Sequence, residues 1–305
     1  MTSDVKRLDA AATIGQALDC CNQALAESDV FYGHGTDSPW DESVQLVLHA
    51  AGLAIDSSDE VLAQAIDGEI RARIEGLLEK RINDRTPLPY LMGRAWFAGL
   101  EFICDRRAII PRSPLAELIL NDFEPWYSGP PPKRLLDLCC GGGCLGLASV
   151  HYFPDLHVDL LDIEGSALAL AEENAESLGV QGRVSILQSD VFSALTDQRY
   201  DIILSNPPYV NREDLASMPA EYHHEPALAL ASGADGLDLT RRILDEAARY
   251  LTPHGLLVVE VGNSWLALDH AYPQLPFTWL ELEQGGHGVF ALTATELQEY
   301  KASTG

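Results

Sequence analysis

The segment Arg134-Leu-Leu-Asp-Leu-Cys-Cys-Gly-Gly-Gly-Cys-Leu-Gly146 decides the fold of this 305-residue chain. It begins with a short apolar run that contains Asp137, continues into three consecutive glycines at 141–143, and ends in the helical pattern of residues 145–150. Glycines allow positive φ and let a ligand approach the main chain closely. A glycine turn between a strand and a helix usually holds a nucleotide-like cofactor at the helix N-terminus. The segment therefore predicts a cofactor-binding α/β domain.

The glycine turn differs from two common nucleotide motifs. A strict Gly-x-Gly-x-x-Gly pattern is not met because its first position is Cys139 or Cys140, and no Gly-Lys-Ser/Thr follows the glycines. Cysteine disfavours positive φ, so we expect Cys139 to have an ordinary backbone conformation and the cofactor contacts to fall to Gly141 and Gly143. Cysteines 139, 140 and 144 lack the C-x-x-C spacing of a zinc site, and we interpret them as small packing residues.

Polar residues also end the next predicted strands. The strand at 157–161 ends at Asp162, the strand at 183–188 is followed by Asp190, and the strand at 200–205 ends at Asn206. In an open parallel sheet the carboxyl ends of the strands share one edge, where ligands bind. An acid at the end of the second strand typically binds ribose hydroxyls. Together with Asp137, these residues predict one site.

The stretch Asn206-Pro207-Pro208-Tyr209 follows the strand at 200–205. Two prolines cannot continue a sheet, so the chain leaves the strand in a stiff turn. A carboxamide offers donor and acceptor atoms, and the Pro207 nitrogen has no hydrogen to donate. Acceptors beside an aromatic ring suit a planar ligand that carries an NH2 group, such as an amide or a base. We expect this turn to bind the acceptor of a reaction.

These motifs resemble those of class I S-adenosylmethionine-dependent methyltransferases, and within them the HemK-like glutamine methyltransferases, which share Asn-Pro-Pro-Tyr. The resemblance covers roughly residues 86–293, and the helices before them more loosely. Segments 31–37, 95–97, 101–102, 110–117 and 221–226 look like the branch that modifies ribosomal proteins. The resemblance implies methylation of the side-chain amide of a glutamine in large-subunit protein uL3. It also implies a Rossmann-like seven-stranded sheet.

The resemblance also implies roles for individual residues. The Asn206 side-chain oxygen and the Pro207 carbonyl would accept the two amide hydrogens of the substrate, and Pro208 and Tyr209 would pack against it. Arg112 and Glu117 are further candidates for substrate binding. The cofactor, S-adenosyl-L-methionine, would become S-adenosyl-L-homocysteine. Its binding residues would be Asp137 for the amino group, Gly141 and Gly143 for the methionine part, Asp162 for the ribose, Asp190 for adenine, and Asn206.

Composition limits the partners. The net charge is −26, with 46 acidic against 20 basic residues. Such a surface repels nucleic acid phosphates and attracts a basic protein, so we expect a basic ribosomal protein as substrate and no direct binding of nucleic acid. There is no apolar run of 18 residues, no signal peptide pattern and no disulfide framework, which predicts a cytoplasmic protein without a membrane span. His223 and His224 have no matching third ligand, so we expect no metal site.

Hydrophobic periodicity predicts three parts. Residues 1–85 form an N-terminal helical domain for substrate docking, in which Ser58 starts one of the helices. Residues 86–112 form a β-hairpin linker, and residues 113–305 the catalytic domain. Within the latter, residues 210–236 form a long polar loop, and residues 277–282 and 288–293 a closing antiparallel pair.

Three other functions fit parts of the sequence. A nucleic acid exocyclic-amine methyltransferase would use the same proline turn, although the acidic charge argues against it. A nucleotide-binding scaffold without activity would have no use for Asn-Pro-Pro-Tyr. Methylation of peptide chain release factors would differ only in substrate. The sequence does not determine the oligomeric state or which glutamine is modified.

Overall fold

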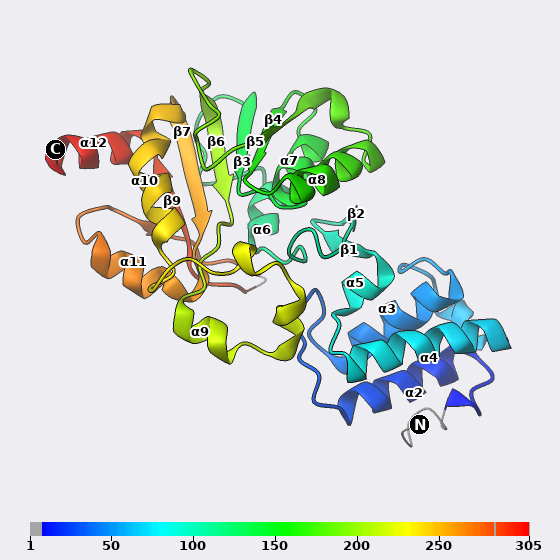
Figure 1. Ribbon diagram of the computed structural model, residues 1–305. Helices are drawn as coiled ribbons and strands as arrows, with labels where there is room; N and C mark the ends of the chain where they lie inside the picture. The colour runs from blue at the N-terminus through cyan, green and yellow to red at the C-terminus, as the bar shows by residue number, and fades with distance from the viewer. Residues whose placement is uncertain (1–7, 284, 305) are drawn as a thin grey trace. The chain divides into compact units, whose positions relative to one another are not determined.

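The computed structural model describes residues 8–283 and 285–304, which form two compact units (Figure 1). Unit 1 comprises the chain up to Ala95 together with the segment Pro219–His224. Unit 2 comprises Trp96–Met218 and the chain from Glu225 onward. A short segment of the helical unit is therefore inserted, in sequence, between two parts of unit 2. None of the described helices is long and apolar enough to cross a membrane.

Unit 1 is a helical bundle. Its helices are α2 (Ile14–Ala26), α3 (Pro39–Ala51), α4 (Gly68–Asn83) and α5 (Leu88–Met92). Each long helix begins at a capping side chain, because Thr13, Ser38 and Asp67 accept hydrogen bonds from first-turn amides. The apolar residues at helical spacing are buried: Ile14, Leu18, Cys21, Leu25, Leu46, Val47 and Ala50. The predicted helical bundle is confirmed.

The helix predicted to start at Ser58 is wrong. The segment contains only η1 (Asp59–Ala63), a short 3-10 helix that receives no side-chain cap from Ser58. The next residues bond instead to the start of α2, since the Ile66 amide donates to Ala12 (3.0 Å) and the Ile14 amide to Gln64 (2.9 Å). Backbone groups used in this pairing are lost to a helical ladder.

Unit 2 is built on a seven-stranded sheet with the order β5-β4-β3-β6-β7-β9-β8. The strands are β3 (Arg134–Leu138), β4 (His157–Asp162), β5 (Val184–Gln188), β6 (Tyr200–Ser205), β7 (Leu251–Glu260), β8 (Thr278–Trp279) and β9 (Val289–Thr293). The first five in this order are parallel, and β9 is antiparallel to both β7 and β8. The predicted seven-stranded α/β sheet and its closing antiparallel pair are confirmed.

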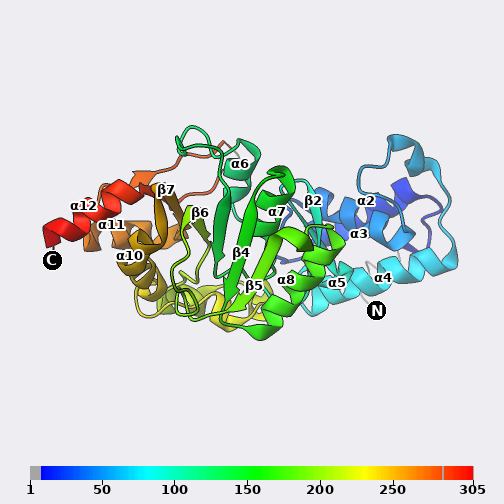
Figure 2. The same ribbon diagram turned by 90° about the horizontal axis from the view of Figure 1, so that it is seen from above.

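Helices cover both faces of the sheet. The helices of unit 2 are α6 (Leu115–Leu120), α7 (Cys144–Tyr152), α8 (Gly165–Ser177), α9 (Arg212–Ser217), α10 (Asp238–Tyr250), α11 (Trp265–Ala271) and α12 (Ala294–Thr304). Adjacent strand residues alternate between two cores: Leu135 packs with α6, α7 and α8, whereas Leu136 packs with α10, α11 and α12. Helices α7 and α8 lie beside β4 and β5 in both views (Figures 1 and 2).

Two connecting segments, the hairpin and the segment 210–236, contain short elements of their own. The predicted hairpin is present as β1 (Arg94–Phe97) and β2 (Leu100–Ile103). Asn174 of α8 fastens it, since its Oδ1 accepts from the Ile103 amide (2.7 Å). The predicted loop at 210–236 is partly helical, with α9, η3 (Ala220–His224) and η4 (Ala227–Ala229).

Candidate functional site

The glycine turn joins β3 to α7 at the carboxyl edge of the sheet. Gly141 (φ 53°) and Gly143 (φ 80°) adopt the left-handed conformation, and the Gly143 amide donates to the Cys140 carbonyl (2.8 Å). A side chain at Gly146 would lie 2.8 Å from Val158 Cγ1, so glycine allows α7 to pack closely against the sheet. The turn thereby brings the start of α7 to the ends of β3 and β4.

The ordinary backbone conformation predicted for Cys139 is wrong. Cys139 has φ 61°, in the left-handed region, although it carries a Cβ. The neighbouring Cys140 amide donates to the Leu161 carbonyl of β4 (3.0 Å), which ties the turn to the sheet. Left-handed geometry costs a non-glycine residue roughly 1–2 kcal/mol, so tertiary hydrogen bonding here outweighs the local preference.

The acids at the strand ends lie in three different environments. Asp137 is fully buried; its Oδ2 accepts from the Gly146 amide (2.8 Å), and its Oδ1 has no hydrogen-bond partner among the described residues. Burial raises the pKa of Asp137 to about 7. Asp162 accepts from the amides of Gly141 (2.8 Å) and Glu164 (2.9 Å).

Asp190 is half-exposed and forms an ion pair with Arg242 of α10 (2.8 Å). The hydrogen bond from Arg242 lowers the pKa of Asp190. This carboxylate is therefore ionised and already partnered in the protein alone.

Two cavities lie at this edge of the sheet. The larger cavity has a volume of about 390 Å³, and the predicted site residues that line it are Gly141, Asp162, Asp190, Asn206 and Pro208. The smaller cavity, of about 40 Å³, is lined by the predicted residues Arg112, Gly141 and Asn206. Five other predicted site residues line neither of these two cavities: Asp137, Gly143, Pro207, Tyr209 and Glu117. Asn206 thus lies where the two cavities meet.

The Asn-Pro-Pro-Tyr corner is held by its last residue. The Tyr209 hydroxyl donates to Glu260 Oε1 (2.9 Å), and the Tyr209 carbonyl accepts from the Ser264 hydroxyl (2.9 Å). Pro207 and Pro208 are buried. Within residues 8–283 and 285–304 no hydrogen bond engages the Asn206 carboxamide, so this group is available to a ligand.

Arg112 and Glu117 serve different neighbours. Arg112 forms a bidentate ion pair with Glu225, whose Oε1 also accepts from the Ile110 amide (2.9 Å). Glu117 accepts from the Glu283 amide (3.0 Å). Arg112 therefore forms part of the wall of the smaller cavity, whereas Glu117 holds the loop at Glu283.

Sequence reasoning missed two carboxylates next to the corner. Glu260 ends β7 as Asp162 ends β4, and that shared pattern was a usable signal. Glu225 was noted within the segment 221–226 and beside the two histidines, but not as a partner of Arg112. In the structure Glu225 pairs with Arg112, while the His224 ring contacts the Asp84 carbonyl (2.9 Å).

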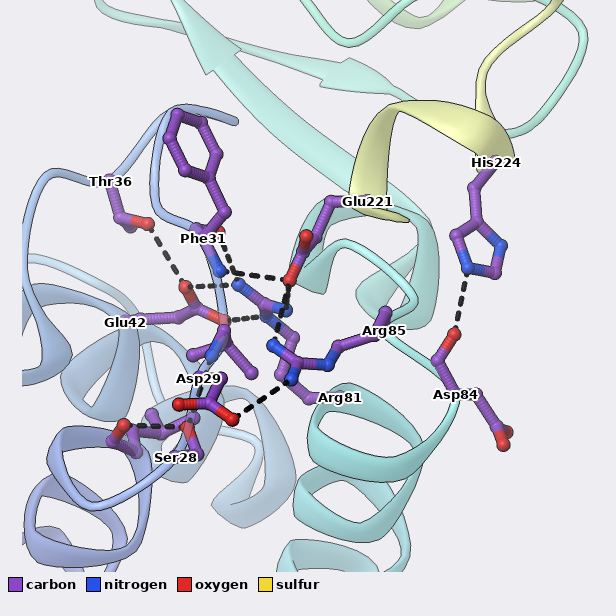
Figure 3. A network of polar contacts seen from close by, with 12 residues as sticks. Ser28, Asp29, Phe31, Thr36, Glu42, Arg81, Asp84, Arg85, Glu221 and His224 are labelled. Atoms are coloured by element: carbon purple, nitrogen blue, oxygen red, sulfur yellow. Dashed lines mark hydrogen bonds and ion pairs between the residues drawn. The ribbon is translucent and has the colours of Figure 1, made fainter. Parts of the chain in front are cut away.

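A third missed group is a polar network inside unit 1 (Figure 3). Arg81 of α4 is 2% exposed and pairs with Glu42 of α3 and with Glu221 (3.0 Å) of the inserted segment. It also donates to the Phe31 carbonyl (2.7 Å), and the Phe31 amide donates to Glu221 (2.9 Å). Burial opposes the ionisation of Glu221, but the Phe31 and Arg81 donors outweigh it and lower the pKa. The network fixes the segment Pro219–His224 within the helical unit.

Comparisons with known proteins agree with this geometry. Residues 116–222 match the family model described as methyltransferase small domain. The solved structure of the hMettl16 catalytic domain in complex with the MAT2A 3′UTR hairpin 1 matches with a TM-score of 0.51 and 15% identity, over 74% of this chain and 80% of that chain. This likeness supports the fold of unit 2.

Two curated relatives are much more similar. A protein of Francisella tularensis subsp. tularensis (strain SCHU S4 / Schu 4) named ribosomal protein uL3 glutamine methyltransferase is 45% identical over 305 residues, 99% of this chain and 97% of its own length. A protein of Bordetella pertussis (strain Tohama I) with the same name is 42% identical over 90% of this chain and 92% of its own length. The family predicted from the motifs is confirmed, and the chain belongs to the ribosomal protein uL3 glutamine methyltransferases.

Proposed function

We propose that this protein transfers a methyl group from S-adenosyl-L-methionine to the side-chain amide nitrogen of a glutamine in ribosomal protein uL3. The observation that carries the proposal is the position of Asn206. Its carboxamide lines both cavities, has no hydrogen-bond partner among the described residues, and ends a strand beside the glycine turn. The names of the two relatives supply the acceptor.

The larger cavity fits the donor. Its volume of about 390 Å³ is within the range of small-molecule sites, and Ile163, Val191 and Leu239 give it apolar walls for a base. A carboxylate has about four acceptor positions. The two amide donors leave Asp162 able to accept from ribose hydroxyls. Gly141 would let the cofactor approach the main chain closely. Asp190 would bind the adenine.

Asp137 and Gly143 do not line the larger cavity, so they would support cofactor binding indirectly. The unpartnered Asp137 Oδ1 suits a cationic amino group, reached through water or through the turn. Gly143 shapes the turn rather than lining the cavity. Bound there, S-adenosyl-L-methionine supplies an electrophilic methyl carbon and becomes S-adenosyl-L-homocysteine.

The corner would orient the acceptor. An amide nitrogen is a weak nucleophile because its lone pair is delocalised into the carbonyl. Asn206 Oδ1 and the Pro207 carbonyl would accept its two hydrogens, which directs the nitrogen and stabilises the positive charge that develops on it. Holding reactants at attack distance contributes up to roughly 7–11 kcal/mol. Pro208 and Tyr209 would pack against the amide, and Arg112 and Glu117 would stabilise the surrounding walls.

The charge of the chain favours the proposed partner. A net charge of −26 attracts a basic ribosomal protein and repels phosphates. This substrate places the reaction in the cytoplasm, where ribosomes are assembled. We propose that the helical unit docks the ribosomal protein, with the hairpin region as the link to the catalytic part.

The test compares Asn206→Ala with Asn211→Ala. Asn211 caps α9 on the same loop and lines neither of the two cavities, so it is a matched control. We expect Asn206→Ala to lower the turnover on uL3 about 10²–10³-fold, as loss of one positioned polar group does. Its cofactor affinity, measured by calorimetry, should change little, and Asn211→Ala should behave like the wild type.

The methyl group is located by mass spectrometry as a gain of about 14 Da on uL3, a release factor or ribosomal RNA offered separately. Labelling of RNA or of the release factor in place of uL3 would overturn the assigned substrate. Equal losses of turnover and of cofactor affinity in Asn206→Ala would overturn the assigned role of Asn206.

A further inference from the structure

Glu260 is a buried carboxylate with an unusual set of partners. It ends β7 and is 6% exposed, yet it forms no ion pair among the described residues. Both of its oxygens accept from hydroxyl groups: Oε1 from Tyr209 (2.9 Å) and Oε2 from Ser113 (2.6 Å). Burying a carboxylate is unfavourable unless hydrogen bonds compensate for it, so its presence needs a reason.

The two partners flank the candidate acceptor site. Tyr209 is the last residue of the Asn-Pro-Pro-Tyr corner, and Ser113 lines the smaller cavity together with Asn206. They lie far apart in sequence, and the Glu260 side chain connects them through its two oxygens. The same carboxylate thereby fixes the corner to a wall of the smaller cavity.

Neighbouring contacts leave little freedom on either side. A side chain at Gly262 would lie 2.6 Å from Tyr209 Cε2, so the ring lies directly against that main chain. On the other side Ser113 Oγ accepts from the Leu115 amide (3.2 Å) at the start of α6. The adjoining wall residues Ile110 and Arg112 are held by Glu225. Glu260 thus links two segments, the corner at Tyr209 and the wall at Ser113, that are each already held by other contacts.

We propose that Glu260 is a positioning residue for methyl transfer, which sets the Asn206 carboxamide against the smaller cavity by holding Tyr209 and Ser113 together. This inference rests on the proposed function. It adds a residue that touches neither donor nor acceptor and acts through Tyr209 and Ser113.

The test uses Glu260→Ala, Glu260→Gln, Tyr209→Phe and their combination. Glu260→Ala should lower kcat on uL3 about 10–100-fold while the cofactor Kd changes less than about threefold, because the larger cavity keeps its lining. Glutamine can accept from Tyr209 and donate to Ser113, so Glu260→Gln should recover most of kcat. Tyr209→Phe combined with Glu260→Ala should be no worse than Glu260→Ala alone, since both remove the same link.

Glu296→Ala is the matched control. Glu296 also accepts two hydrogen bonds, from the amide and hydroxyl of Thr293, but on α12 away from the corner. It should leave kcat unchanged. Losses that multiply in the double variant, or a Glu260→Gln variant as slow as Glu260→Ala, would overturn the proposal.

Hydrogen exchange provides a measurement that does not depend on whether uL3 is the substrate. Glu260→Ala should accelerate exchange in peptides that span 206–210 and 110–115, and should leave the β3 and β4 peptides protected. If the wild type fails to methylate uL3 but this pattern appears, the proposed substrate is wrong, whereas the link that Glu260 makes between Tyr209 and Ser113 stands. Uniformly faster exchange would show that Glu260 only stabilises unit 2.

Discussion

The buried charges of the helical unit and the acids at two strand ends of the methyltransferase unit differ in their partners. In unit 1, Arg81 and its partner Glu42 have side chains that are 2% and 3% exposed, and Glu221 completes the network. In unit 2, Asp137 is equally buried, but among the described residues no cation pairs with it and its Oδ1 has no hydrogen-bond partner. Asp190 does have a cation, Arg242, yet both are about half-exposed.

We interpret this difference as one between charges that hold the structure and charges that are available to a ligand. A buried pair becomes very costly when one partner is removed, because the other charge stays desolvated. In unit 2 burial destabilises Asp137 and the half-exposed Asp190 is weakly held, so we expect a bound ligand to gain energy from these two acids. The buried Arg112–Glu225 pair of unit 2 is instead comparable to the network of unit 1. Three substitutions test this comparison.

The largest effect is expected from Arg81→Met, which keeps a long apolar side chain but removes the cation from buried Glu42 and leaves Glu221 with the more distant Arg85 (3.6 Å). We expect unit 1 to lose about 3–5 kcal/mol. Native-state hydrogen exchange of α3 and α4 measures this locally. Glu69→Gln on the same helix removes the exposed pair with Arg73, whose side chains are 80% and 48% exposed, and should cost less than about 1 kcal/mol. Similar losses in the two variants would contradict the comparison.

Asp137→Asn should stabilise unit 2 in a pH-dependent way. Burial raises the pKa of Asp137 to about 7, from the ordinary aspartate value of 3.8, so the fold favours the protonated carboxyl. Wild-type stability should therefore fall between about pH 4 and pH 7 relative to the variant, by up to about 4 kcal/mol at 1.36 kcal/mol per unit. Thermal unfolding from pH 4 to 8 checks this, with exposed Asp155→Asn as control. Parallel curves for wild type and Asp137→Asn would refute it.

The smallest effect is expected from Arg242→Gln. This pair is half-exposed, so its loss should change the free energy of unfolding by less than about 1 kcal/mol, and less at high salt. Denaturation at low and high salt measures it, beside Lys133→Gln, which removes another exposed pair. A loss comparable to that of Arg81→Met would show that Asp190 is a structural anchor and not a ligand group.

Local patterns predicted which residues share one edge of the sheet. The glycine turn, the acids at strand ends and the proline corner each depend on a few adjacent residues and on the rule that parallel strands end at one edge. They correctly brought Gly141, Asp162, Asp190 and Asn206 to one cavity. Helical spacing likewise predicted α2, α3 and α4.

Two other features could not be predicted from local sequence patterns. The left-handed backbone of Cys139 opposes its local preference and follows from a hydrogen bond to β4. The pairing of residues 64–66 with the start of α2 replaced the helix expected after Ser58. In both cases a contact distant in sequence outweighed a local propensity of about 1 kcal/mol.

The sequence by itself determined the seven-stranded sheet and the family, because local periodicity and short motifs specify them. Only the tertiary structure decided which carboxylates act together. Glu42 and Glu221 meet on Arg81, and Ser113 and Tyr209 meet on Glu260, across separations of 39 to 147 residues. These contacts depend on how whole helices and strands pack. Because they are buried, breaking them is more costly than breaking a contact at the surface.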